Sequence, residues 1–157
     1  PSPIPCGTRS RPITDAARRS AVRHRAGEQC GIPFSLKDIT MQKILIIVHA
    51  PPYGSERCLS ALRLAIALAG SDAQPKVELF LMSDATVMAL PHQQDANGSG
   101  LQGMVEELVR NGVTIRLCRT CALARGLGDL PLIPGTTIGT LPELAQATLD
   151  ADKVITF

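Results

Sequence analysis

Two cysteines, Cys118 and Cys121, form a C-x-x-C pair whose surroundings favour thiol chemistry. Cys118 comes directly after the apolar segment 113–117, which has the composition of a strand. Three arginines lie within a few residues of it: Arg116, Arg119 and Arg125. A neighbouring cation favours the thiolate form of cysteine, and the thiolate is the nucleophile. We therefore expect Cys118 to be able to take up a sulfane sulfur and pass it on.

The pair also permits other interpretations. Cysteine is often simply a small buried hydrophobe. A dithiol redox switch is a second alternative, although a thioredoxin-like motif normally opens a helix after the first strand, whereas this pair follows a late strand. A zinc site would need two further ligands. The chain has no second C-x-x-C, and His49 and His92 are the only histidines after residue 40, so we expect no bound metal.

The turn 49–56 is the other segment that could hold a ligand, because it precedes a predicted helix whose N-terminus could bind an anion. It contains neither G-x-G-x-x-G nor a Walker lysine, so we expect no nucleotide or other cofactor. Ser55 is instead predicted to cap the helix. Cys58 falls inside that helix and is expected to pack in the core, whereas Cys6 and Cys30 are expected to be incidental.

The elements that must position Cys118 alternate along the chain from Met41 onward. Short apolar runs predict strands at 43–48, 77–81, 113–117 and 153–157. Apolar residues at helical spacing predict helices at 56–69, 85–90 and 101–110, and a weak helical turn at 121–126. Asp84 is expected to cap the second of these helices, and the polar stretch 93–100 is expected to be a loop.

A last helix is predicted after a capping box formed by Thr140 and Glu143. Its expected apolar side consists of Leu141, Leu144, Ala145 and Leu149. Strands that alternate with helices predict an α/β fold with a mainly parallel sheet and helices on both faces. In such sheets the chemistry lies at the carboxyl ends of the strands, where Cys118 is predicted to be.

The first 40 residues differ from the rest of the chain. They contain five prolines and seven of the Arg and Lys residues against three acidic ones, and no sustained apolar periodicity. We expect a poorly ordered N-terminal extension over 1–40, with Met41 as a candidate physiological start, and a single α/β domain over 41–157. An Arg-rich organellar targeting peptide is the rival interpretation of this extension.

Composition narrows the function classes. The chain of 157 residues carries a net charge of +2, but residues 41–157 hold nine basic and eleven acidic residues and no basic stripe, so we expect no nucleic-acid partner. No apolar run approaches the roughly 20 residues that cross a bilayer, so no membrane association is expected. Five cysteines at irregular spacing do not indicate a disulfide framework, so we expect a cytoplasmic protein with free thiols.

Several segments together resemble the DsrE/DsrF/TusD family, most closely its YchN-type branch. The matching segments are 41–44, 50–56, 62–68, 79–84, 117–121, 125–126, 130–133, 138–145 and 151–157. The resemblance covers 41–157 and none of 1–40. It implies a flavodoxin-like three-layer α/β/α fold with about five strands, and a ring-shaped homotrimer or homohexamer. It also implies a persulfide-carrying cysteine near a subunit interface, and the relay cysteine of the TusD-type members matches Cys118 rather than Cys121.

The resulting hypothesis is a sulfur-relay protein in which Cys118 accepts sulfane sulfur from a donor protein and passes it to an acceptor. Arg119 and Arg125 are expected to stabilise the charge, and Cys121 is expected to have a secondary role as a resolving thiol. Such a protein is a carrier or sulfurtransferase rather than a classical turnover enzyme. Two alternatives stay open: a non-catalytic homo-oligomeric scaffold or small-ligand sensor, and a C-x-x-C thiol-disulfide switch.

Overall fold

The computed structural model describes residues 41–93 and 100–157. The expected N-terminal extension 1–40 and most of the expected loop 93–100 lie outside these residues. The described part forms five strands: β1 (Lys43–Val48), β2 (Lys76–Leu81), β3 (Thr114–Cys118), β4 (Thr136–Gly139) and β5 (Lys153–Thr156). All pair in parallel in the order β4-β3-β2-β1-β5. The predicted α/β class with a parallel five-stranded sheet is confirmed.

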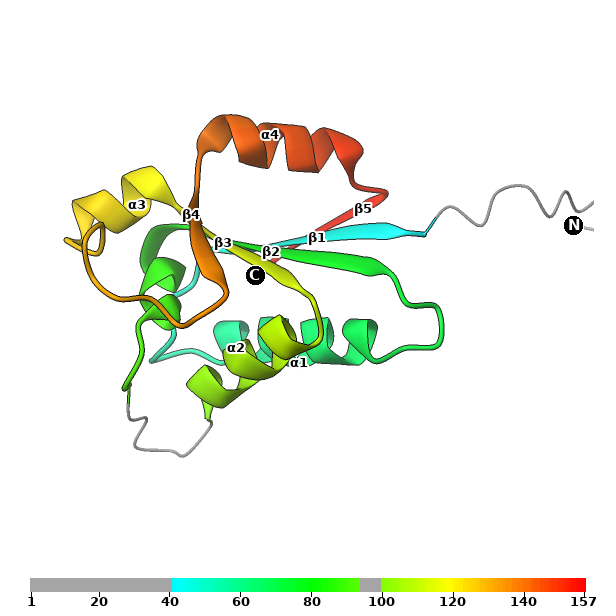
Figure 1. The fold of residues 1–157 in the computed structure, drawn as a ribbon, viewed down its shortest axis with the longest axis horizontal. Coiled ribbons are helices and arrows are strands. Elements are labelled where there is room, and N and C mark those ends of the chain that lie inside the picture. The colour runs from blue at the N-terminus through cyan, green and yellow to red at the C-terminus, as the bar shows by residue number, and fades with distance from the viewer. Residues whose placement is uncertain (1–40, 94–99) are drawn as a thin grey trace, which may run out of the picture. The chain divides into compact units, whose positions relative to one another are not determined.

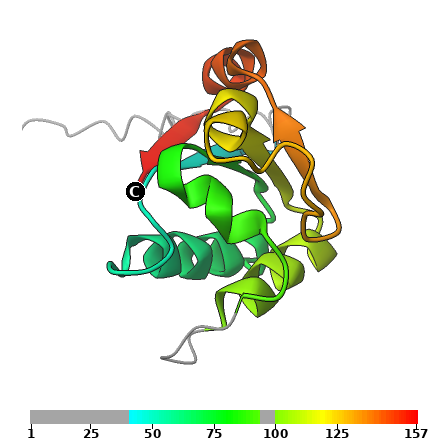
Figure 2. The same ribbon diagram turned by 90° about the vertical axis from the view of Figure 1, so that its left-hand side faces the viewer.

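Two long helices cover one face of this sheet and a third covers the other (Figure 1). Helices α1 (Arg57–Ala69) and α2 (Leu101–Arg110) lie on the first face, and α4 (Leu141–Asp150) lies on the opposite face. The short helix α3 (Arg119–Ala124) and the 3₁₀-helix η1 (Ser83–Ala89) lie at the carboxyl ends of the strands (Figures 1 and 2). A site at the carboxyl ends of the strands would therefore lie among η1, α3 and α4.

The two faces of the sheet differ in how much apolar surface they bury. The large core lies between the sheet and helices α1 and α2, and it includes Ile46, Leu62, Leu79, Leu108 and Ile115. The smaller cluster under α4 has three fully buried members, Leu45, Phe80 and Cys118. No residue of α4 itself is buried. Burial of apolar area is the main favourable term in folding, so α1 and α2 are held more firmly than α4.

Two of the predicted helix caps, at Ser55 and Asp84, do not form. Ser55 does not cap α1, because the helix begins at Arg57 with Glu56 as its N-cap. The backbone at Glu56 (φ −87°, ψ 5°) lies outside the extended region that a capping side chain requires, and no side-chain cap bond forms. Asp84 does not act as a cap either, because η1 begins one residue earlier, at Ser83, with Met82 as its N-cap.

Three further differences concern the second half of the chain. Helix α3 begins at Arg119, immediately after β3, rather than near Cys121. Strand β4 was not predicted, because its four residues contain a single large apolar side chain, Ile138. The expected apolar side of α4 was only partly right. Leu144 and Ala147 pack against the small cluster, whereas Leu141 and Leu149 are 51% and 80% exposed and Ala145 is also exposed.

Candidate functional site

Cys118 is the last residue of β3, and α3 follows it at once. The register places it beside Gly139 of β4, and its side chain is 1% exposed. It packs with Leu45 and Phe80 on the face of the sheet that α4 covers. The predicted location at the carboxyl end of a strand is therefore confirmed, and the thiol is enclosed rather than open to solvent.

Side chains alternate between the two faces of the sheet along β3, which explains why Cys118 points to the face that α4 covers. Ile115 and Leu117 are buried against α1 and α2, so the intervening Arg116 and the following Cys118 point to the opposite side. Gly139 leaves the space that this arrangement needs. A Cβ at that residue would lie 3.1 Å from the side chains of both Arg116 and Phe80.

Cys121 is brought to the same place by α3. It is half-buried and packs against the cluster that contains Cys118, together with Met82. Cys58, Cys118 and Cys121 are all free thiols in the described part of the chain. The structure thus brings the two cysteines of the C-x-x-C pair to one apolar cluster, one on the sheet and one on the short helix above it.

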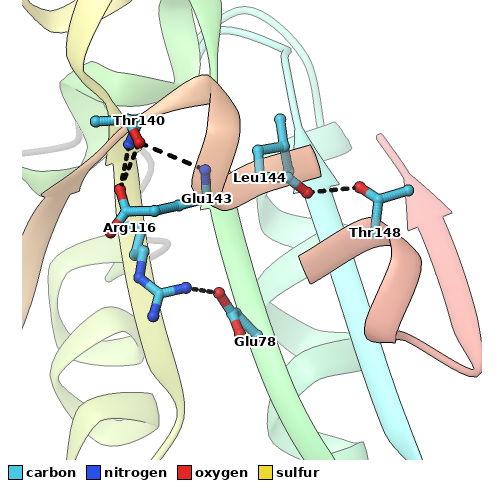
Figure 3. A network of polar contacts seen from close by, with 6 residues as sticks. All are labelled: Glu78, Arg116, Thr140, Glu143, Leu144 and Thr148. Carbon is cyan, nitrogen blue, oxygen red and sulfur yellow. Dashed lines mark hydrogen bonds and ion pairs between the residues drawn. The ribbon is translucent and has the colours of Figure 1, made fainter. Parts of the chain in front are cut away.

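The three arginines near Cys118 in sequence do not form a cluster of free positive charge. Arg116 forms an ion pair with Glu78 of β2, on the face below α4 (Figure 3). Arg125 forms an ion pair with Asp84 of η1, with 2.7 Å between Nη2 and Oδ1. Arg119 is exposed. Carboxylates from two other elements therefore balance two of the three charges, and sequence proximity alone could not reveal these partners.

The capping box at the start of α4 forms as predicted. The Thr140 backbone N–H donates to Glu143 Oε2 at 2.6 Å, and the Glu143 backbone N–H donates to Thr140 Oγ1 at 3.4 Å. Hydrogen bonds from the backbone and then the side chain of Thr140, with a smaller effect of the Arg116 charge, hold the pKa of Glu143 below its ordinary value. Figure 3 shows this box next to the Arg116–Glu78 pair. The box fixes where α4 begins above the sheet.

Cys58 packs in the core as predicted. Its side chain is fully buried, and its Sγ–H donates to the Ala50 carbonyl oxygen at 3.0 Å. Burial raises the pKa of the Cys58 thiol to about 11. A thiol that stays protonated is a poor nucleophile, so Cys58 has a structural role.

Other kinds of site find little support. Among residues 41–93 and 100–157, no group of three or more His, Cys, Asp or Glu side chains is placed to hold a metal ion. A hollow lined by His49, Arg57, Thr156 and Phe157 lies at the carboxyl ends of β1 and β5. None of the helices in the described ranges is long and apolar enough to cross a membrane.

The fold and the strand-end cysteine define a small α/β protein with a parallel five-stranded sheet and an enclosed thiol. The model of the DsrE/DsrF-like family matches residues 42–157, and the chain belongs to this family. It is 50% identical over 117 residues to the protein YchN of Escherichia coli K12, which covers 74% of this chain and 100% of that protein. The crystal structure of E. coli ychN matches with a TM-score of 0.72, and the match covers 74% of this chain and 100% of that chain.

A more distant relative carries a functional name. The sulfurtransferase TusD of Yersinia pestis is 28% identical over 130 residues, which covers 73% of this chain and 97% of that protein. The structure of MTH1491 from Methanobacterium thermoautotrophicum, at 16% identity and a TM-score of 0.58, shares the fold. The YchN-type resemblance found in the sequence is thus confirmed.

Proposed function

We propose that this protein works in sulfur relay and that Cys118 carries the sulfur as a persulfide. The observation that carries the proposal is the place of Cys118, at the carboxyl end of β3 in an apolar cluster with a second thiol beside it. Membership of the DsrE/DsrF-like family and similarity to a sulfurtransferase support a role in sulfur transfer. An apolar site suits a persulfide, because it keeps water and stray reductants away from a reactive sulfur.

The proposed transfer conserves atoms and electrons. The Cys118 thiolate attacks the terminal sulfur of a donor persulfide, so the S–S bond of the donor breaks and a new S–S bond forms on Cys118. The donor leaves as a thiol after taking up the proton that Cys118 lost. The same exchange with an acceptor thiol returns Cys118 to its starting state, and no external oxidant is needed.

Cys121 is proposed to limit the lifetime of this persulfide. Its thiolate can attack the inner sulfur on Cys118, which forms a Cys118–Cys121 disulfide and releases hydrogen sulfide. Arg125 is held by Asp84 and by the Cys121 carbonyl oxygen, so it acts on the position of α3 as well as on local charge. Arg119 is exposed and remains available to an incoming anionic sulfur group.

The test is intact-protein mass spectrometry after incubation with polysulfide, on the wild type and on Cys118→Ser, Cys121→Ser and Cys58→Ser. We expect a gain of one sulfur, about 32 Da, that reductant reverses. The gain should be lost in Cys118→Ser and kept in Cys58→Ser, the matched control with a buried thiol. Trypsin cuts after Arg116, Arg119 and Arg125, so the two cysteines fall on separate peptides, 117–119 and 120–125. A gain that survives Cys118→Ser refutes the assignment.

A thiol-disulfide switch is the second candidate, because both thiols pack against one cluster. It predicts that mild oxidation removes two hydrogens from the wild type and that Cys118→Ser and Cys121→Ser abolish this loss equally. Sulfur transfer predicts a much larger effect of Cys118→Ser on the mass gain. The two outcomes can be read from the same spectra.

We also propose that the protein is a homotrimer or homohexamer. Leu141 and Leu149 of α4 and Val154 of the edge strand β5 are large apolar side chains that stand exposed. Contiguous exposed apolar surface is typical of protein interfaces. Multi-angle light scattering should give three or six subunits, and a monomer at micromolar concentration would contradict the proposal.

A further inference from the structure

Helix α3 follows Cys118 directly and packs, together with α4, against the cluster that contains this cysteine. Little apolar surface holds α3 in place: Ala122 is its only fully buried residue, Cys121 is half-buried, and Leu123 is 58% exposed. The backbone bonds around its end are local, such as the Leu127 N–H that donates to the Ala122 carbonyl oxygen at 2.9 Å. Burying one alanine gives little free energy, so apolar packing alone holds α3 weakly.

An ion pair joins α3 to the firmer part of the structure. Arg125 Nε and Nη2 donate to Asp84 Oδ1 at 3.0 and 2.7 Å, and Nη1 donates to the Cys121 carbonyl oxygen at 3.1 Å. Within residues 41–93 and 100–157, no other side-chain hydrogen bond links α3 or its C-cap to another element. Arg125 therefore connects the backbone of the cysteine-bearing turn to η1.

The 3₁₀-helix η1 is a firm anchor for this connection. Ala85, Met88 and Ala89 are buried in the large core. The Thr86 hydroxyl donates to the Ser83 carbonyl oxygen at 2.8 Å, which fixes the turn that presents Asp84. Because η1 is buried in the large core and α3 buries little apolar surface, loss of the ion pair should loosen α3 more than η1.

We propose that Asp84 is a positioning residue which, through Arg125, holds α3 closed over Cys118 and so sets how often this thiol is accessible. At 1% exposure the thiol cannot meet a sulfur donor until the cover moves. The inference deepens the proposed function, since it describes how the same cysteine is reached. Opening of α3 would be the step that precedes sulfur transfer, and closure would protect the product.

The test is the rate of thiol alkylation by N-ethylmaleimide in wild type, Asp84→Asn and the matched control Asp72→Asn. Asp72 is an exposed carboxylate in the turn between α1 and β2. Loss of an exposed ion pair should raise the rate at Cys118 about two- to fivefold in Asp84→Asn, and leave it unchanged in the control. Added salt should raise the alkylation rate at Cys118 in wild type toward that of Asp84→Asn, because salt screens the Arg125–Asp84 ion pair. Salt should have little effect on this rate in Asp84→Asn.

Cys58 serves as an internal reference for global unfolding, because its fully buried thiol can react only when the core opens. Equal acceleration at Cys58 and Cys118, or no acceleration at Cys118, would overturn the proposal. The exchanged pair Asp84→Arg with Arg125→Asp should restore the slow rate at Cys118, and failure to do so would also count against it. Alkylation needs no sulfur transfer, so a normal alkylation result without any persulfide would refute the proposed function alone.

Discussion

The buried thiol of Cys58 predicts a specific loss of stability in alkaline solution. Its pKa is about 11 in the folded protein against 9.0 for an unperturbed thiol. A raised folded pKa means that the contribution is fully present below pH 9.0 and is lost as the pH rises through about 11. This difference in pKa corresponds to about 2.7 kcal/mol of unfolding free energy, of which about 1.4 kcal/mol is lost by pH 10. Cys58→Ser keeps a donor for the Ala50 carbonyl oxygen but does not ionise in this range.

Urea unfolding in the presence of reductant, at neutral pH and at about pH 10, measures this difference for both proteins. Wild type should lose about 1.4 kcal/mol more than Cys58→Ser over this interval. The other cysteines, the lysines and the tyrosine are common to both proteins, so their titration cancels. If both proteins lose the same free energy of unfolding over this interval, the fold does not hold the Cys58 thiol protonated.

Two other predictions concern local geometry. Thr140→Ala removes the capping box and should lower the free energy of unfolding by about 1 kcal/mol in urea titrations at neutral pH. Because the bonds from Thr140 lower the pKa of Glu143, the part of this deficit that depends on the carboxylate should be lost as the pH falls below 4.5, whereas the part from the Glu143 N–H bond to Thr140 Oγ1 should remain. A deficit that does not change with pH would argue against the carboxylate half of the box. Gly135→Ala should be strongly destabilising in thermal melts, because Gly135 has φ +90° and an added Cβ would overlap the Val109 side chain. Adding Val109→Ala should restore part of the lost stability, because it removes the overlap. If it restores none, the backbone angle is the whole cause.

The sequence predicted elements well where one signal dominates. The run 43–48 became β1 and the apolar spacing of 101–110 became α2, because each pattern is long enough to have one interpretation. β4 was missed because Thr136 and Thr137 give β-propensity without an apolar run, and its place at the sheet edge needs few buried side chains. The caps expected at Ser55 and Asp84 failed because residue type does not determine the backbone angles that capping requires.

The site was predicted in part. The place of Cys118 follows from the end of one strand, which local sequence indicates. The partners of Arg116 and Arg125 lie 38 and 41 residues away, so only the folded topology brings Glu78 and Asp84 to them. The degree of burial of Cys118 likewise depends on Phe80 and Leu45 from two other strands. Short-range patterns therefore predicted the place of Cys118, the proposed nucleophile, but not its electrostatic surroundings.

The strand order has a consequence for biosynthesis. β1 lies between β2 and β5, so the first strand of the domain to be made pairs on one side with the last. On the ribosome, β1 presents an unpaired edge built from Ile44, Leu45 and Ile46 until residues 153–156 have emerged. Unpaired apolar edges are the usual starting points of aggregation. One edge of β1 thus stays unpaired until β5 has been made, whereas its other edge can pair with β2 much earlier and so bury part of the strand.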